Sequence, residues 1–285
     1  MLEKEYFLNK KQQSILDIKI LLYTNKNVLK DTIRSVLKKL GLNIEHFQFT
    51  EDFNECSNLL EQIGKGIFIL DWTVNLESSL QFLRFIKSKQ LYSNIYTFIV
   101  SQQLDDKVIA IATEYAVSKV HSGDITQNKI ELFINDIIKQ IQTLDPIQSS
   151  FNKAVEARKA LKFKESVVIL KAILDKHQDN PRIIVELAEN YILLEQWQNA
   201  MDLLVGLQDR EPVYVRALHL YGKCLIKFKK YKQAIDVLNK AKIISPYNVD
   251  RLLLLGGKHL KLGEVDEAKE NFNQALQYMP KKKKC

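Results

Sequence analysis

The sequence predicts two folds in one chain: an α/β doubly wound five-stranded parallel sheet, and after it an all-α superhelix of repeated helical hairpins. In the first half, short apolar runs alternate with amphipathic stretches of helical length. In the second half, proline recurs at Pro212, Pro246 and Pro280, a constant step of 34 residues. We therefore expect an α/β domain over residues 1–145 and four helical repeats over residues 147–282.

The elements of the first half follow from composition and from glycine punctuation. The run Ile67-Phe68-Ile69-Leu70 is continuously apolar, as expected for a central parallel strand that is buried on both faces. Gly41 and Gly64 end the first two helices. The expected strands cover residues 18–23, 43–49, 67–70, 95–100 and 117–121. The expected helices cover residues 27–40, 52–63, 77–89, 105–115 and 126–142.

Functional groups of such sheets lie at the carboxyl ends of the strands. Asp71 directly follows Ile69-Leu70 at the end of the third expected strand. On this placement, residues 16 to 143 resemble the receiver domain of two-component response regulators. The resemblance implies a flavodoxin-like fold and makes Asp71 the phosphoacceptor candidate. The neighbouring strand ends would complete its pocket with Thr24, Asn25, Ser101 and Ser122.

Other positions depart from the receiver pattern. The family holds Mg²⁺ with an acidic pair after the first strand, where this chain has Thr24-Asn25. Because a hard divalent cation prefers anionic oxygens, these neutral residues weaken metal binding. The family's lysine–proline pair after the fifth strand is replaced by Ser122-Gly123, and its aromatic switch residue by Lys119.

Phosphoryl transfer needs a metal and cations that neutralise the developing charge. We therefore expect a degenerate receiver that is not phosphorylated efficiently and uses no cofactor. Lys26 could lend the missing positive charge. The alternative is a true response regulator, in which phosphorylation of Asp71 with bound Mg²⁺ gates partner binding by the repeats.

The second half keeps a 34-residue register in several columns. Two columns are small and two are bulky or apolar, so paired helices can approach closely while larger side chains fill the space behind. The four columns are Ala154/Ala188/Gly222/Gly256, Ser166/Ala200/Ala234/Ala268, Leu170/Leu204/Leu238/Phe272 and Ile173/Leu207/Ala241/Ala275. This pattern resembles tetratricopeptide (TPR) repeats, with units at 147–180, 181–214, 215–248 and 249–282. The resemblance implies a partner-binding protein.

The groove of such a superhelix is lined mainly by the first helix of each repeat. By repeat position, it should expose Phe151, Val155 and Val185 together with a set of cations. The candidate partner-binding residues are Arg182, Arg216, His219 and Lys223. Cations in a groove suit an acidic peptide or a carboxyl terminus, with which they form charge-assisted hydrogen bonds.

Charge is shared unevenly along the chain. Residues 147–285 hold 25 Lys and Arg against 16 Asp and Glu, whereas residues 1–146 hold 17 against 18. Residues 281–285 form a basic tail, and Lys227–Lys232 is the densest internal basic stretch. Nucleic-acid or other polyanion binding by this half is therefore a further alternative, although no helix-turn-helix or aromatic–basic RNA motif accompanies it. Partly exposed apolar residues near the end of the last repeat (Phe272, Leu276 and Tyr278) would also allow a homodimer.

Several classes of function are not indicated. The three cysteines are far apart and the five histidines have no metal-ligand spacing, so we expect neither a disulfide framework nor a metal site. No nucleophile, phosphate-loop or zinc-protease motif is present, and we expect no enzymatic activity. The longest apolar runs are too short to span a bilayer, which together with the cysteine usage favours a cytoplasmic location away from membranes.

Overall fold

The computed structural model describes residues 18–279 except 65, 90, 92–94, 104–105, 125, 143–145, 178 and 208–214. Pro212, Pro280 and the basic tail at 281–285 thus lie outside the described residues. The chain forms two compact units. The α/β unit comprises Met1–Asp105 and Tyr115–Pro146, and the helical unit comprises Asp106–Glu114 and Ile147–Cys285.

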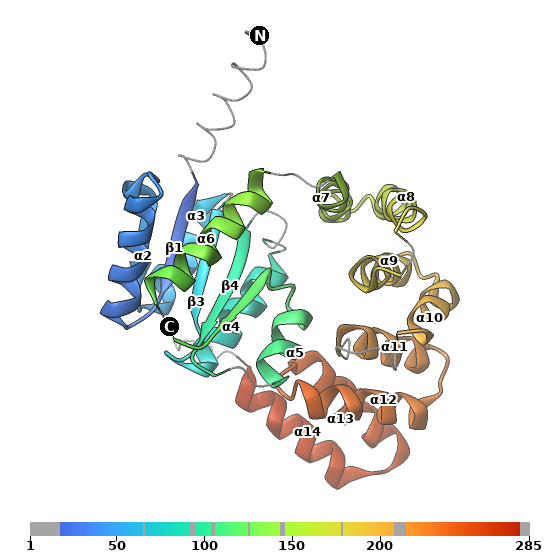
Figure 1. Ribbon diagram of the computed structural model, residues 1–285. Helices are drawn as coiled ribbons and strands as arrows, with labels where there is room; N and C mark the ends of the chain where they lie inside the picture. The colour runs from blue at the N-terminus through green and yellow to red at the C-terminus, as the bar shows by residue number, and fades with distance from the viewer. Residues whose placement is uncertain are drawn as a thin grey trace. The chain divides into compact units, whose positions relative to one another are not determined.

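The α/β unit contains the predicted five-stranded parallel sheet, with strand order β2-β1-β3-β4-β5 (Figure 1). All four neighbouring pairs are parallel. The order reverses between β1 and β3, which places the carboxyl ends of these two strands beside a switch point of the topology. The strands are β1 (Lys19–Tyr23), β2 (Phe47–Thr50), β3 (Gly66–Asp71), β4 (Ile95–Ser101) and β5 (Lys119–Ser122).

Both faces of the sheet are covered by helices. On one face, α2 (Asn27–Lys39) and α6 (Gln127–Gln142) enclose a core that includes Ile20, Leu22 and Phe98. On the other face, α3 (Phe53–Ile63) and α4 (Leu76–Ser88) bury an aromatic cluster. Its centre is Phe82, whose ring lies 4.4 to 5.6 Å from the rings of Phe53, Tyr23 and Phe68.

The second strand begins later than the expected residue 43. Ile44–His46 forms a short 3-10 turn (η1), because the side chain of Asn43 accepts a hydrogen bond from the amide of Glu45 at 3.0 Å. Asparagine favours such a turn over a strand, since its side chain mimics the backbone. The pairing with β1 starts only at Phe47.

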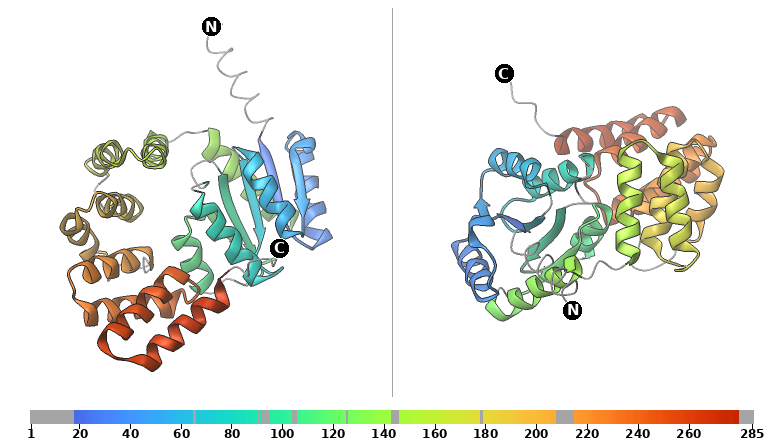
Figure 2. Two further views of the ribbon diagram at one scale, coloured as in Figure 1. Left: turned by 180° about the vertical axis from the view of Figure 1, so that it is seen from behind. Right: turned by 90° about the horizontal axis from the view of Figure 1, so that it is seen from above.

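In the described part of the helical unit, eight helices cover the predicted repeats, in addition to α5 (Asp106–Glu114). In Figure 1, α7, α9 and α11 form one layer of this unit and α8, α10 and α12 form another; Figure 2 shows the hairpins from two further sides. Pro246 follows the end of α12 by two residues, as expected of a residue that cannot continue a helix. The helices are α7 (Pro146–Lys159), α8 (Phe163–Leu174), α9 (Pro181–Leu193), α10 (Trp197–Val205), α11 (Val215–Lys227), α12 (Tyr231–Ile244), α13 (Val249–Leu262) and α14 (Val265–Tyr278).

The small columns lie where the two helices of a hairpin approach most closely. A Cβ atom on Gly222 would lie 2.6 Å from the side chain of Leu238, and one on Gly256 would lie 2.7 Å from the ring of Phe272. The column that starts at Ser166 is at most 2% exposed in all four repeats. The 34-residue register therefore reports helix packing.

Each hairpin turn repeats a left-handed residue at the same step. Leu161, Glu195, Lys229 and Gly263 have φ values of 59°, 58°, 60° and 84°. A residue in this conformation ends a helix by directing its amide back to the last turn. The left-handed backbone conformation costs little free energy only for glycine. Three of the four turns therefore carry a strained residue.

One helix is assigned differently from the predicted boundary at residue 145. Helix α5 (Asp106–Glu114), which lies between β4 and β5 in the sequence, belongs to the helical unit. Ala110 joins the buried cluster of Val215 and Leu218 on α11. The carboxylate of Glu114 also accepts hydrogen bonds within this unit, which explains the assignment.

Among the described helices, none has both the length and the apolar character needed to cross a bilayer.

Candidate functional site

Asp71 is a buried carboxylate at the end of β3, and its side chain is 1% exposed. Thr24, which follows β1, donates its hydroxyl to Oδ2 of Asp71 at 2.8 Å. Thr73 donates to Oδ1 twice, through its amide at 3.1 Å and its hydroxyl at 2.7 Å. Both carboxylate oxygens are thus hydrogen-bonded within the protein.

Lys26 supplies a positive charge to the same pocket. Its Nζ atom lies 3.9 Å from Oδ2 of Asp71 and donates a hydrogen bond of 2.5 Å to the hydroxyl of Thr73. Its backbone amide donates to the hydroxyl of Thr24 at 3.0 Å. Asp71 therefore ties the loop after β1 to the loop after β3.

In the described part of the chain, the remaining predicted pocket residues form no hydrogen bond with Asp71. Ser101 is buried, but its hydroxyl donates to the backbone carbonyl of Gln103 at 2.6 Å. Asn25 and Ser122 are exposed. Across the part of the chain that the structure describes, no three His, Cys, Asp or Glu side chains gather as a metal site would require. The arrangement is suited to holding two loops together rather than to presenting an oxygen to a phosphoryl donor.

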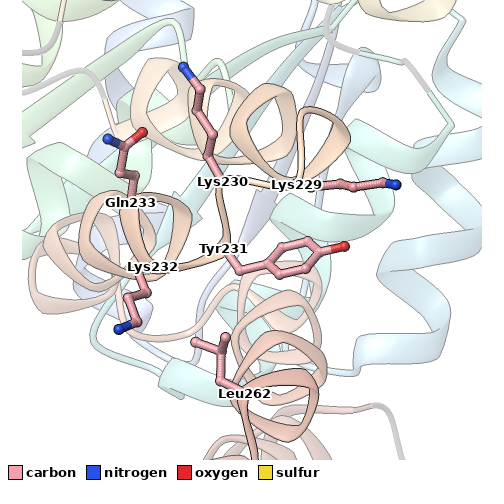
Figure 3. Close-up of a pocket in the computed structure, with 6 residues that line it drawn as sticks. All are labelled: Lys229, Lys230, Tyr231, Lys232, Gln233 and Leu262. Atoms are coloured by element: carbon pink, nitrogen blue, oxygen red, sulfur yellow. The ribbon is translucent and has the colours of Figure 1, made fainter.

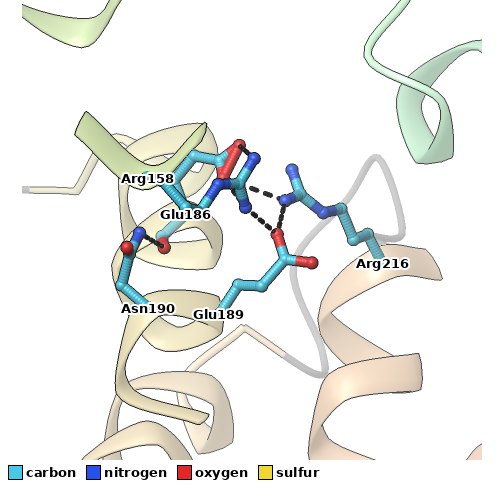
Figure 4. A network of polar contacts seen from close by, with 5 residues as sticks. All are labelled: Arg158, Glu186, Glu189, Asn190 and Arg216. Carbon is cyan, nitrogen blue, oxygen red and sulfur yellow. Dashed lines mark hydrogen bonds and ion pairs between the residues drawn. The ribbon is translucent and has the colours of Figure 1, made fainter. Parts of the chain in front are cut away.

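A second polar site joins the first helices of three repeats (Figure 4). Nη1 of Arg158, at the end of α7, lies 3.1 Å from the carboxylate of Glu186 and 2.5 Å from that of Glu189, both on α9. Nη2 of Arg216, on α11, lies 2.9 Å from Glu186 and also pairs with Glu189. We call these four residues the charge network.

The charge network is largely buried and electrically balanced. The side chain of Glu186 is 2% exposed and that of Arg216 is 12% exposed. Burial disfavours the charged guanidinium of Arg216, but the carboxylates of Glu186 and Glu189 outweigh this effect and hold its pKa above the usual value. The amide of Asn190 donates to the backbone carbonyl of Glu186 at 2.8 Å. The charge of Arg216 is therefore neutralised within the protein.

The other predicted groove residues lie in different environments. Arg182 is exposed, and its guanidinium lies 4.3 Å from the centre of the Phe151 ring while it donates to the side chain of Gln148 at 3.2 Å. Lys223 is half-buried and His219 is buried. The expected exposure of Phe151, Val155 and Val185 is wrong, because all three are at most 4% exposed. Arg182 and Lys223 are thus the accessible cations of this predicted set.

Among the buried charged groups that were not anticipated, two have a signal in the repeat register. Arg251 is 1% exposed and occupies the buried column of Ile183 and Ala217. Glu186 likewise occupies the buried column of Leu220. A charged residue at a register position that is buried and apolar in the neighbouring repeat indicates a buried ion pair, since burial of an unpaired charge is too costly.

The helical unit has counterparts among known proteins. The family model described as anaphase-promoting complex, cyclosome, subunit 3 matches residues 158–241, from the end of α7 into α12. Solved structures are similar over part of the chain. They include a crystal structure of MamA (20% identity, 45% of this chain and 74% of that chain, TM-score 0.42). A MamA fragment from Desulfovibrio magneticus RS-1 shares 14% identity over 53% of this chain and 85% of that chain (TM-score 0.43).

A third similar structure is TTC0263, described as a thermophilic TPR protein of Thermus thermophilus. It shares 20% identity over 46% of this chain and 74% of that chain, with a TM-score of 0.42. These three likenesses are distant and cover about half of this chain. The family match over residues 158–241 and the 34-residue register support a TPR-type region in the second half of this chain.

Proposed function

We propose that this protein is a non-catalytic scaffold that binds partner proteins through its TPR-type helical unit. The carrying observation is the stack of four hairpins, whose small columns are packed at every repeat. Stacked hairpins present an extended surface, and such surfaces serve to bind other polypeptides. Arg182 and Lys223 are the cations of the first-helix layer that we assign to partner contact.

We further propose that the α/β unit is a receiver-like, flavodoxin-like domain that has lost efficient phosphorylation. Three hydrogen bonds from Thr24 and Thr73 occupy both oxygens of Asp71, which is 1% exposed. Attack on a phosphoryl donor would require this buried carboxylate to become accessible and a metal to be held by neutral neighbours. Asp71 acts here as a structural carboxylate.

Partner binding is tested by a quantitative pull-down with the full chain. We expect an Arg182→Glu/Lys223→Glu variant to recover its specific partners poorly, because two accessible cations are reversed. A Lys240→Glu/Lys269→Glu variant is the charge-matched control, since both residues are exposed on second helices. Equal recovery of every partner by the two variants would remove the first-helix layer from the proposal.

Phosphorylation is tested separately with acetyl phosphate and Mg²⁺. We expect no acid-labile adduct on the intact protein by mass spectrometry. A stoichiometric adduct that disappears in Asp71→Asn would instead support the response-regulator alternative. The two assays are independent, because the pull-down needs no modification of Asp71.

A further inference from the structure

Two similar pockets lie at one edge of the helical unit. Each is formed by the turn of one hairpin, the first residues of its second helix, and residues from the end of the next repeat's first helix. One pocket, of about 390 Å³, is lined by Glu195–Asn199 together with Lys227 and Phe228. The other, of about 340 Å³, is lined by Lys229–Gln233 and Leu262 (Figure 3). The turn segments are one 34-residue repeat apart, and so are Phe228 and Leu262. The same structural position therefore forms a pocket in successive repeats.

Each pocket has an aromatic wall. Trp197 and Tyr231 are the first residues of α10 and α12, and both are half-buried. Phe228, which lines the first pocket and precedes the turn that lines the second, is 40% exposed. Exposed apolar side chains beside hollows of this size suit the side chains of a bound polypeptide.

Lysines surround these pockets. Figure 3 shows Lys229, Lys230 and Lys232 extending in different directions around Tyr231 and Leu262. We call the following six residues the lysine edge: Lys227, Lys229, Lys230, Lys232, Lys258 and Lys261. Within the described part of the chain, no carboxylate forms an ion pair with any of these six lysines.

The lysine edge differs from the charge network in whether its cations are paired with carboxylates. In the network, Arg216 is balanced by Glu186 and Glu189. At the edge, five of the six ammonium groups belong to exposed residues, and none of the six forms an ion pair in the described part of the chain; Glu195 is the one carboxylate residue among those that line the two pockets. A concentrated positive field of this kind attracts a negatively charged partner and raises its rate of association.

The aromatic rings favour a polypeptide over a nucleic acid as that partner. Nζ of Lys227 lies 5.3 Å from the centre of the Trp197 ring, and Nζ of Lys258 lies 5.4 Å from that of Tyr231. An ammonium thus already lies over one face of each ring. Single-stranded nucleic acids bind by stacking bases on open aromatic faces, which these contacts obstruct.

We propose that this edge is a second binding surface, separate from the first-helix layer, for an acidic segment of a partner protein that carries apolar side chains. The carboxylates pair with the lysine edge, and the apolar side chains enter the pockets beside Trp197 and Tyr231. The two pockets lie one repeat apart, with lysines around them. The bound segment must therefore carry apolar residues at separate positions, with acidic residues between them.

The test measures fluorescence anisotropy of labelled probes with the full chain at low salt. The probes are a peptide of repeated Glu-Glu-Phe triplets, a peptide of Glu-Glu-Ser triplets, and oligothymidylate. We expect the phenylalanine peptide to bind most tightly. Lys229→Glu/Lys232→Glu should weaken its binding about tenfold or more, and higher salt should weaken it further.

Two variants make the test specific. Lys240→Glu/Lys269→Glu changes the net charge equally on exposed residues of second helices and should bind as the unmodified protein does. Phe228→Ser should reduce the preference for the phenylalanine peptide over the serine peptide. Circular dichroism verifies that each variant is folded. Equal weakening in both charge variants, an unchanged preference in Phe228→Ser, or tighter binding of oligothymidylate than of either peptide would overturn the proposal.

Discussion

Arg251 and Glu114 form an ion pair in which each side chain is only 1% exposed. The guanidinium donates to Oε1 of Glu114 at 2.5 Å and to the backbone carbonyls of Ala241 and Ser245 at 3.0 and 2.5 Å. Glu114 also accepts from the side chains of Ser245 and Asn248. One carboxylate on α5 thus satisfies groups from the end of α12 to the start of α13.

Removal of one member of this pair should destabilise the helical unit strongly. We expect Glu114→Gln to lower the free energy of unfolding by about 3–5 kcal/mol, because Arg251 is left buried without a counter-charge. The measurement is urea unfolding followed by circular dichroism. The double variant Glu114→Leu/Arg251→Met should recover much of this loss, and a double variant as unstable as the sum of its single changes would contradict the pairing.

In the charge network, we expect loss of the more buried carboxylate to lower the free energy of unfolding more than loss of the more exposed one. Glu186→Gln leaves Arg158 and Arg216 with one carboxylate in a site where Glu186 is 2% exposed, and we expect a loss of about 3 kcal/mol. Glu189 is 26% exposed, so Glu189→Gln should cost less because water can replace the lost contact. Thermal unfolding of both variants under one set of conditions gives the order. A larger loss for Glu189→Gln would disagree with the geometry.

Two neighbouring glycines on α13 provide a matched pair. A Cβ atom at position 256 would lie 2.7 Å from the Phe272 ring, whereas one at position 257 would meet nothing within 4 Å. We expect Gly256→Ala to destabilise by about 1–3 kcal/mol through overpacking. Gly257→Ala should stabilise by about 0.5–1 kcal/mol because alanine favours the helix. Changes of the same sign in the two melting temperatures would contradict the close approach of α13 and α14.

At the left-handed positions of the hairpin turns, we expect a change to glycine to stabilise the protein and a change from glycine to alanine to destabilise it. Leu161 has φ of 59° and is 75% exposed, so Leu161→Gly relieves strain without removing a packed side chain. We expect this change to stabilise by about 0.5–1 kcal/mol and Gly263→Ala to destabilise by about 1 kcal/mol. Chemical unfolding of the two variants measures both. A destabilised Leu161→Gly variant would show that the leucine contributes more than its strain costs.

Cys56 and Cys224 should react with thiol reagents only when the protein unfolds. Both are 0% exposed. Burial raises the pKa of Cys224 to about 11, and the pKa of Cys56 is raised further by burial and the neighbouring Glu55. The reactive thiolate is therefore scarce at pH 8. In a Cys285→Ser background, we expect iodoacetamide to label neither cysteine in buffer and both in urea; rapid labelling in buffer would indicate local opening.

The sequence by itself determined the order of elements and the packing columns. Strand and helix periods differ, and glycine or proline marks most ends, so the elements could be assigned locally. The 34-residue step placed the hairpins because close helix packing tolerates only small residues at fixed positions, as Gly222 beside Leu238 shows. The strand end at Asp71 was also predictable, since parallel strands bring their carboxyl ends to one edge.

Only the tertiary structure decided which charges are available. Arg216 is a cation of the first-helix layer by register, yet Glu186 and Glu189 neutralise it from α9. Likewise, Thr24 and Thr73 enclose Asp71, and α5 contributes Glu114 to the helical unit. Periodicity reports which face of a helix is buried, but the partner of a charge depends on distances between elements that are remote in the sequence. Those distances exist only in the folded chain.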